Sequence, residues 1–229
     1  MTDHFHAALT SGAFPIAVSL PRHDMALAEA ARDAGADALK LHLNAYHRAS
    51  GTTFGSFEEE RPFIEAVASL GLPLLVMAGQ ETVPSAGEME ALADLGFEGF
   101  NVYFAHMQPH LLACRLRPMP AMADTSTEAD LAAMNALPGA IIEASIVPFS
   151  AYGTPLDEAD LDAYRAIAQK SAAPVIVPSQ KRFVPGDMAR LREAGIAGAL
   201  LGVVVTGDTP DSLHDAVAPI VRAARQMRH

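Results

Sequence analysis

Three polar side chains alternate with leucines in the segment 38–44. Lys40, His42 and Asn44 stand two residues apart, with a leucine on either side of Lys40 and of His42. Residues two apart in a strand share a face, so we expect the polar side chains on one face and the leucines on the other. Lysine and histidine can transfer protons, and a desolvated lysine can attack a carbonyl carbon. This segment is the first candidate for chemistry.

Two further segments repeat this spacing. Asn101 alternates with Tyr103, and Glu143 alternates with Ser145, each within an apolar run. Burying a lysine and a carboxylate costs several kcal/mol per ion before they pair, so such residues need a reason to lie inside. A structural ion pair is one reason, and an acid–base pair is the other. Polar rows on three strands exceed what packing needs, which favours the acid–base pair.

The elements that must position these residues follow a recurring order. A helical stretch rich in Ala and Leu leads to a glycine, and a short apolar strand follows. The glycines suit the left-handed residue that closes a helix. They are Gly35, Gly71, Gly96 and Gly195. The predicted strands are residues 14–20, 36–44, 72–78, 97–104, 118–123, 140–147, 174–177 and 196–205.

Eight strands alternating with seven or eight helices predict a single (β/α)8 barrel domain over residues 1–229. An open, doubly wound sheet is the alternative. Helices cover the outside of a parallel barrel, so the leucines beside Lys40 must point outward and the polar rows inward. A capping box at Ser56 with Glu59, and Thr209 before Pro210, mark two helix starts. The connection 105–117 is the least regular, because Pro109 interrupts it.

A long loop over residues 45–55 follows the second predicted strand. It combines a cation with hydroxyls and glycines, and it leaves the carboxyl end of the barrel, where enzymes of this fold work. Such loops often close over a ligand and exclude water, although a solvated connection without a role is the alternative. Arg48 is the best ligand contact in this loop.

The seventh and eighth strands lead into a candidate phosphate cradle. Loops after these strands carry the phosphate site in many barrels, where backbone amides face the anion. Gly202 permits close approach of the backbone, and Ser179 or Thr206 can donate a hydroxyl. A glycine kept only for tight packing is the alternative explanation.

The second half of the chain also resembles a known group. Residues 123–127 (Ala-Asp-Thr-Ser-Thr), 173–176 and 202–206 are similar to the N-acylmannosamine-6-phosphate 2-epimerase family and, more broadly, to the ribulose-phosphate-binding barrels. The resemblance implies a phosphosugar ligand and places Asp124 on the rim of the site. The family's catalytic lysine and glutamate have no counterpart in residues 76–80 and 178–180. Lys40 and Glu143 are the residues left for those roles.

Composition narrows the partners. The formal charge of −11 disfavours nucleic acid and anionic membranes, and Cys114 is the single cysteine. No apolar run is long enough to cross a bilayer, and the first residues do not look like a signal peptide. We therefore expect a cytoplasmic protein that acts on a small phosphorylated molecule without a cofactor or metal. The sequence is also compatible with a homo-oligomer.

Three functions follow from these patterns. The first is an isomerase or epimerase that moves a proton beside a carbonyl group, and the second is a lyase that forms a Schiff base on Lys40. The third is a barrel that binds a phosphorylated ligand without catalysis. A metal-assisted lyase using His42, Asp124 and Glu143 lacks a spacing motif.

The candidate catalytic residues are Lys40, Glu143, His42 and Asp124. The candidate substrate-binding residues are Asn44, Arg48, Asn101, Tyr103, Ser145, Ser179, Gly202 and Thr206.

Overall fold

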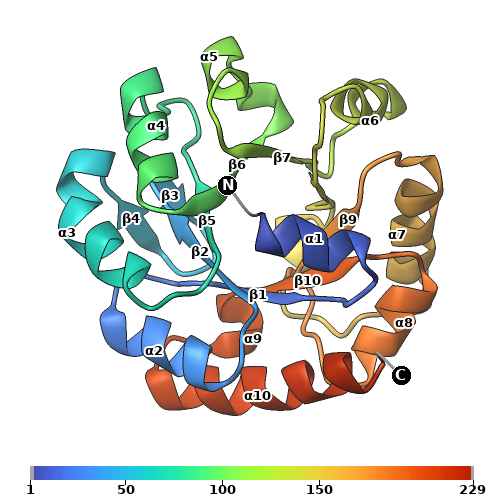
Figure 1. The fold of residues 1–229 in the computed structure, drawn as a ribbon. Coiled ribbons are helices and arrows are strands. Elements are labelled where there is room, and N and C mark those ends of the chain that lie inside the picture. The colour runs from blue at the N-terminus through green and yellow to red at the C-terminus, as the bar shows by residue number, and fades with distance from the viewer. Residues whose placement is uncertain (1–2, 228–229) are drawn as a thin grey trace.

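The computed structural model describes residues 3–227, and within them eight parallel strands close into a barrel (Figure 1). The order around the barrel is β1-β10-β9-β8-β7-β6-β5-β2. Strand β1 pairs with both β10 and β2, so the first and last strands meet. This closure confirms the predicted (β/α)8 barrel and rules out the open sheet.

The barrel strands are short, two to seven residues each. They are β1 (Ile16–Ser19), β2 (Ala38–His42), β5 (Leu74–Met77), β6 (Phe97–Tyr103), β7 (Arg117–Ala121), β8 (Ile142–Glu143), β9 (Val175–Pro178) and β10 (Gly198–Leu201). Two more strands, β3 (Ala45–His47) and β4 (Thr52–Phe54), form an antiparallel hairpin outside the barrel.

Helices surround the barrel or cap its ends. The longer ones are α2 (Met25–Asp33), α3 (Phe57–Ala68), α4 (Ala86–Asp94), α6 (Glu128–Asn135), α7 (Glu158–Lys170) and α10 (Pro210–Gln226). The shorter ones are α1 (His4–Thr10), α5 (Pro109–Leu112), α8 (Asp187–Glu193), α9 (Val203–Thr206) and the 3-10 turns η1 (Phe104–His106) and η2 (Phe149–Ala151). Among residues 3–227, no helix combines the length and the apolar character needed to cross a membrane.

Side-chain direction follows the predicted alternation in β2. Leu39, Leu41 and Leu43 pack into the large apolar layer between the barrel and its helices. Lys40 and His42 point into the barrel, where they line a cavity. The outward leucines therefore fix the inward direction of the two polar residues.

Helix α1 was not predicted, and it closes one end of the barrel. In Figure 1 it crosses the ring of strands near the centre. Phe5 and Leu9 pack on an apolar layer made by inward residues of the strands, among them Ala17, Leu75 and Met119. The end of the barrel that α1 covers is therefore filled with apolar side chains. The cavity described below lies toward the carboxyl ends of the strands.

Local signals set the helix ends as predicted. Ser56 accepts from the Glu59 amide while the Glu59 carboxylate accepts from the Ser56 amide, and Thr209 caps α10 before Pro210. The glycines expected to close helices all adopt positive φ, between 73° and 90°. They are Gly35, Gly71, Gly96 and Gly195.

Three predicted segments were wrong in detail, whereas the predicted irregularity of the connection 105–117 was confirmed. Residues 203–206 are the helical turn α9, not the end of the eighth strand, since Gly202 ends the extended backbone. Strand β8 has only two residues, because the Ser145 amide turns back to the Glu143 carbonyl (3.0 Å). The loop 45–55 contains the β3–β4 hairpin. The connection 105–117 holds only single turns of helix.

Candidate active site

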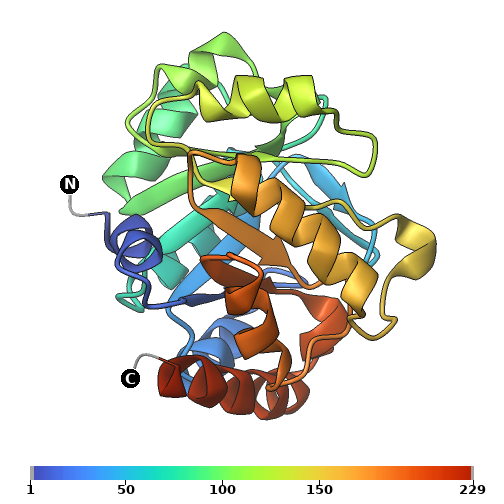
Figure 2. The same cartoon turned by 90° about the vertical axis from the view of Figure 1, so that its right-hand side faces the viewer.

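A cavity of about 480 Å³ opens at the carboxyl ends of the barrel strands. The hairpin β3–β4 and the segment with η2 stand at this end, opposite α1 and the two ends of the described chain (Figure 2). Ten of the twelve predicted site residues line it. They are Lys40, His42, Arg48, Asn101, Tyr103, Asp124, Glu143, Ser145, Ser179 and Gly202.

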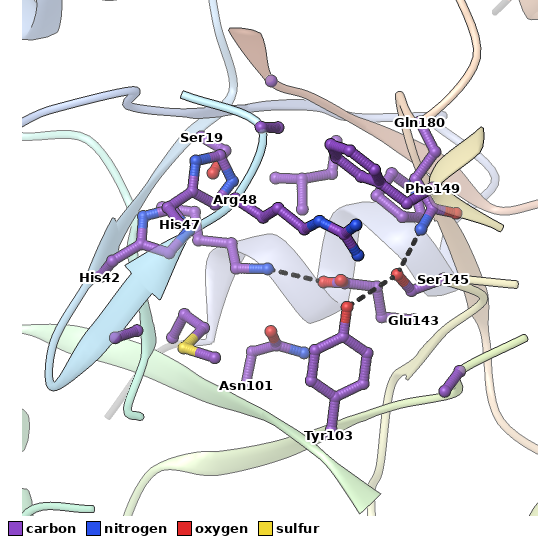
Figure 3. Close-up of a pocket in the computed structure, with 18 of the residues that line it drawn as sticks. Ser19, His42, His47, Arg48, Asn101, Tyr103, Glu143, Ser145, Phe149 and Gln180 are labelled. Carbon is purple, nitrogen blue, oxygen red and sulfur yellow. Dashed lines mark hydrogen bonds and ion pairs between the residues drawn. The ribbon is translucent and has the colours of Figure 1, made fainter. Parts of the chain in front are cut away.

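The charged pair Lys40 and Glu143 lies on the inner wall. Lys40 Nζ donates to Glu143 Oε2 at 2.8 Å, across the barrel from β2 to β8 (Figure 3). The two side chains are only 5% and 7% exposed. Both residues also line the cavity, so a ligand can reach the pair. The arrangement places a primary amine and a carboxylate at one point, where a proton can pass between them.

Asn101 lies on the same inner wall in β6. Its amide nitrogen donates to the Met119 carbonyl of the neighbouring strand β7 at 2.7 Å. This bond holds the side chain in one orientation and presents the rest of the amide to the cavity. Asn101 is therefore placed to accept a hydrogen bond from a ligand hydroxyl.

Two histidines and a phenylalanine pack together where the hairpin meets β2. The His42 ring lies 4.7 Å from the His47 ring and 4.8 Å from the Phe54 ring. Burial, reinforced by His47 and Lys40, holds the pKa of His42 well below its usual value. Burial and the charge of Lys40 lower the pKa of His47 to about 4. Both rings are neutral at pH 7, so they serve as polar contacts without charge.

Arg48 extends from the hairpin over the cavity. Its guanidinium carbon lies 3.6 Å from the centre of the Phe149 ring, which belongs to η2 on the opposite rim (Figure 3). Within residues 3–227, no carboxylate pairs with Arg48. The contact joins the two rims, and it leaves the guanidinium N–H groups available to an anion.

Two polar residues of the site were missed by sequence analysis. Gln180 follows β9, and its amide nitrogen donates to Ser145 Oγ at 2.8 Å and to Tyr152 Oη at 2.6 Å. Tyr103 Oη lies 3.5 Å from the same Ser145 hydroxyl. Tyr152 and Gln180 come from irregular segments, where no periodicity signals an inward side chain. In the sequence, residues 178–180 stood out only because the glutamate of the epimerase family is absent there.

The predicted phosphate cradle is only partly assembled. Ser179 Oγ accepts from the Gly202 amide at 2.8 Å, so this amide is already used. Val203 and Val204 line the cavity at the start of α9, where helical N–H groups lack partners within the helix. Thr206 is fully buried, donates to the Gly207 carbonyl and lies outside the cavity lining.

Asn44 and Asp124 also differ from expectation. Asn44 adopts a left-handed backbone (φ 49°) and donates to the Ala78 carbonyl at 3.3 Å, so it lies outside the cavity lining. The alternation of β2 therefore ends at His42. Asp124 reaches the cavity but is exposed on its rim. Within residues 3–227, no three or more His, Cys, Asp or Glu side chains gather as metal ligands.

Comparison with known proteins places the fold. No protein-family model and no curated protein matches the chain. Solved structures do match. Tryptophan synthase from M. tuberculosis has a TM-score of 0.74 at 16% identity, covering 96% of this chain and 97% of that one. Tryptophan synthase subunit alpha from Legionella pneumophila str. Paris has a TM-score of 0.73 at 12% identity, covering 99% and 100%.

The tryptophan synthase A-subunit from Pyrococcus furiosus has a TM-score of 0.68 at 10% identity, covering 92% of this chain and 98% of that one. None of these three structures is an N-acylmannosamine-6-phosphate 2-epimerase, so the epimerase part of the sequence resemblance gains nothing from them. Identities this low establish shared architecture alone. The chain has the (β/α)8 barrel fold of the tryptophan synthase alpha structures.

Proposed function

We propose that this protein is a lyase that forms a Schiff base between Lys40 and a small phosphorylated carbonyl compound. The observation that carries the proposal is the 2.8 Å contact of Lys40 Nζ with Glu143 Oε2 on the wall of the cavity. Similar barrels over almost the whole chain are named tryptophan synthases, which supports an enzymatic role. From the sequence alone, this lyase is the alternative to the isomerase.

The contact supports a sequence of proton transfers with one carboxylate. Glu143 takes a proton from the Lys40 ammonium, and the free amine adds to the substrate carbonyl carbon. A second nitrogen proton passes to the new alkoxide, Glu143 gives its proton to the resulting hydroxyl group, water leaves, and an iminium ion forms. Glu143 then takes the proton of the β-hydroxyl group as the carbon–carbon bond breaks. The electron pair enters the iminium, and Glu143 protonates the resulting enamine. Water hydrolyses the iminium that this forms, which releases the product and frees Lys40.

The same geometry is less suited to the isomerase predicted from the sequence. An epimerase with two groups holds its acid and its base on opposite faces of one carbon, whereas Lys40 and Glu143 touch each other. A single-base isomerase remains a second candidate, since Glu143 can abstract a proton beside a carbonyl. The ligand's phosphate would lie near Ser179 and the start of α9, as proposed for the cradle.

Reductive trapping tests the proposal. The protein is incubated with dihydroxyacetone phosphate or glyceraldehyde 3-phosphate, and separately with pyruvate as an unphosphorylated carbonyl probe, then reduced with borohydride and mapped by mass spectrometry. We expect an adduct on Lys40. The chain has only two other lysines, Lys170 and Lys181, and both are ion-paired, with Glu128 and Asp160. They serve as internal controls.

Lys40→Arg keeps the charge and should abolish the adduct, while Glu143→Gln should slow its formation. Absence of a Lys40 adduct with every compound, or equal labelling of all three lysines, would refute the lyase. Deuterium entering a C–H bond without cleavage or adduct would identify the isomerase instead. Binding of these compounds without either signal would identify a non-catalytic barrel.

A further inference from the structure

Gln180 organises the polar side of the cavity. The residue is buried and lies two positions after the end of β9. Its side chain reaches three partners: the Val147 amide (3.1 Å), the Ser145 hydroxyl (2.8 Å) and the Tyr152 hydroxyl (2.6 Å). A single side chain thus ties together three points of the segment that follows β8.

The Val147 contact fixes which way the amide faces. A backbone N–H can only donate, so the Gln180 oxygen must face Val147 and the Gln180 nitrogen must face the two hydroxyls. Both N–H bonds of Gln180 are then used, one on Ser145 Oγ and one on Tyr152 Oη. The two hydroxyl oxygens are acceptors in these bonds, and their own protons point elsewhere.

Two of the three hydroxyl protons have no acceptor within this group. Ser145 and Tyr103 lie 3.5 Å apart, so one of the two hydroxyls donates to the other and one proton remains. Tyr152 keeps its proton as well, since it accepts from Gln180. Burial raises the pKa of Tyr103 and of Tyr152, so both phenols stay protonated above neutral pH. Two hydroxyl donors are therefore available to a ligand.

Arg48 adds a positive charge on the same side. Figure 3 shows its side chain reaching toward Phe149, and Arg48 lines the same cavity as Ser145 and Tyr103. Two carboxylates act on the tyrosines of this group, and the negative charges of Glu143 and Asp124 help to raise the pKa of Tyr103 and Tyr152. Glu143 is already paired with Lys40. Asp124, the other carboxylate of the lining, is exposed on the rim. The donors thus surround a place suited to a small anion.

We propose that this group of donors (Ser145, Tyr152, Tyr103 and Arg48) binds the carboxylate of a 2-oxo acid whose carbonyl carbon reacts with Lys40. The inference rests on the proposed function and names its substrate class. A carboxylate has two oxygens, which match two hydroxyl protons and one guanidinium. Ser145 follows Glu143 by two residues, so the bound anion lies beside the reacting carbon, as the carboxylate of a 2-oxo acid does. Gln180 is a positioning residue, because it acts through the hydroxyls.

The test compares two probes of equal size. Pyruvate and hydroxyacetone share a methyl ketone, but hydroxyacetone carries a neutral CH2OH in place of the carboxylate. The rate of borohydride trapping on Lys40 is measured for both, and the ratio of the two rates is compared between variants so that intrinsic reactivity cancels. We expect Gln180→Glu and Tyr152→Phe each to lower the preference for pyruvate by about tenfold or more. In Gln180→Glu the new carboxylate accepts the hydroxyl protons.

Tyr164→Phe is the matched control. Tyr164 is fully buried, its hydroxyl has no partner among residues 3–227, and it does not line the cavity. This variant should keep the wild-type ratio. Ser145→Ala provides a second donor deletion, and thermal unfolding checks that each variant folds.

The outcomes separate the two proposals. Trapping on Lys40 with an unchanged pyruvate preference in Gln180→Glu and Tyr152→Phe would overturn this inference and leave the lyase intact. Absence of trapping with both probes refutes the lyase only if the two phosphorylated compounds also give no adduct on Lys40. Pyruvate binding to Lys40→Met, followed by saturation-transfer NMR, then decides the inference. If Tyr152→Phe weakens this binding, the carboxylate site is supported. If pyruvate does not bind, or if Tyr152→Phe leaves binding unchanged, the inference is overturned.

Discussion

Lys40 Nζ and Glu143 Oε2 lie 2.8 Å apart in the barrel although 103 residues separate them in the chain. Both side chains are almost completely withdrawn from water. Taking two ions out of water costs several kcal/mol each, and their mutual attraction offsets this only while both are present. Each of the two charges is therefore tolerated in the barrel only while its partner is present.

Removal of one partner should destabilise the fold far more than removal of both. Glu143→Leu leaves a buried ammonium without a counterion, and we expect the free energy of unfolding to fall by about 3–5 kcal/mol. The double variant Lys40→Met with Glu143→Leu should recover most of this loss, because no buried charge remains. Urea unfolding of the single and double variants measures both values.

The surface pair of Lys170 with Glu128 is the control for this cycle. Lys170→Met should change the free energy of unfolding by less than about 1 kcal/mol, since exposed ion pairs contribute little. Equal stability losses in the single and double buried variants would contradict the prediction.

Acid should weaken the packing of His42 against His47, where the hairpin meets β2. The pKa of His47 is lowered to about 4 and that of His42 lies well below its usual value, so the folded protein binds fewer protons than the unfolded chain. The stability that these rings contribute is present above about pH 6.5 and is lost as pH falls toward 4. Each ring steepens this loss by up to about 1.4 kcal/mol per pH unit.

Urea unfolding between pH 7 and pH 4.5 tests this, with His47→Gln expected to show a shallower slope than wild type. His214→Gln is the control, because His214 is an exposed residue of α10 whose side chain is 47% accessible. A slope unchanged in His47→Gln, or changed equally in His214→Gln, would show that His47 does not carry the effect.

The hairpin should open more often without its contact across the rim. Arg48 stacks on Phe149 at 3.6 Å, and such a contact at an accessible site contributes about 0.5–1 kcal/mol. Arg48→Met should therefore speed hydrogen exchange of the amides in β3 and β4 by roughly two- to fivefold. Phe149→Leu should do the same.

Exchange in α10 serves as the reference region of the same experiment. Faster exchange throughout the chain would point to general destabilisation, and no change in the hairpin would mean that the stacking does not hold it closed.

Helix α1 should contribute strongly to stability. Phe5 is 2% exposed and packs on the apolar floor of the barrel, and its amide donates to Glu98 Oε2 at 2.8 Å. Phe5→Ala should lower the free energy of unfolding by about 3–5 kcal/mol, because it leaves a cavity at the barrel end. Thr10→Ala, at the exposed end of the helix, should change it by no more than about 0.5 kcal/mol. Comparable losses in both variants would contradict a plug role for Phe5.

The sequence was most informative where a residue's direction follows from a strand period. Lys40 and Glu143 were predicted to point inward because leucines and isoleucines beside them had to point outward. The helix ends were equally predictable. Gly35 adopts a positive φ and Ser56 caps the start of α3, and few residue types fill either role.

The missed residues lie where the chain leaves the strands. Asn44 keeps the spacing of β2 but turns away, because its backbone is left-handed. Thr206 belongs to a helical turn whose three valines, Val203 to Val205, are typical of a strand. Tyr152 and Gln180 meet only in three dimensions, through loops whose path depends on tertiary contacts.

The two rims of the cavity are built by segments that lie outside the closed barrel. Arg48 stands on a hairpin whose two strands pair only with each other, and Phe149 stands on a turn after β8. Neither segment supplies a strand of the closed ring. Substitutions there can alter which ligand is admitted while the amine and carboxylate below stay in place. The residues that contact a ligand at the rims can therefore change without displacing Lys40 and Glu143.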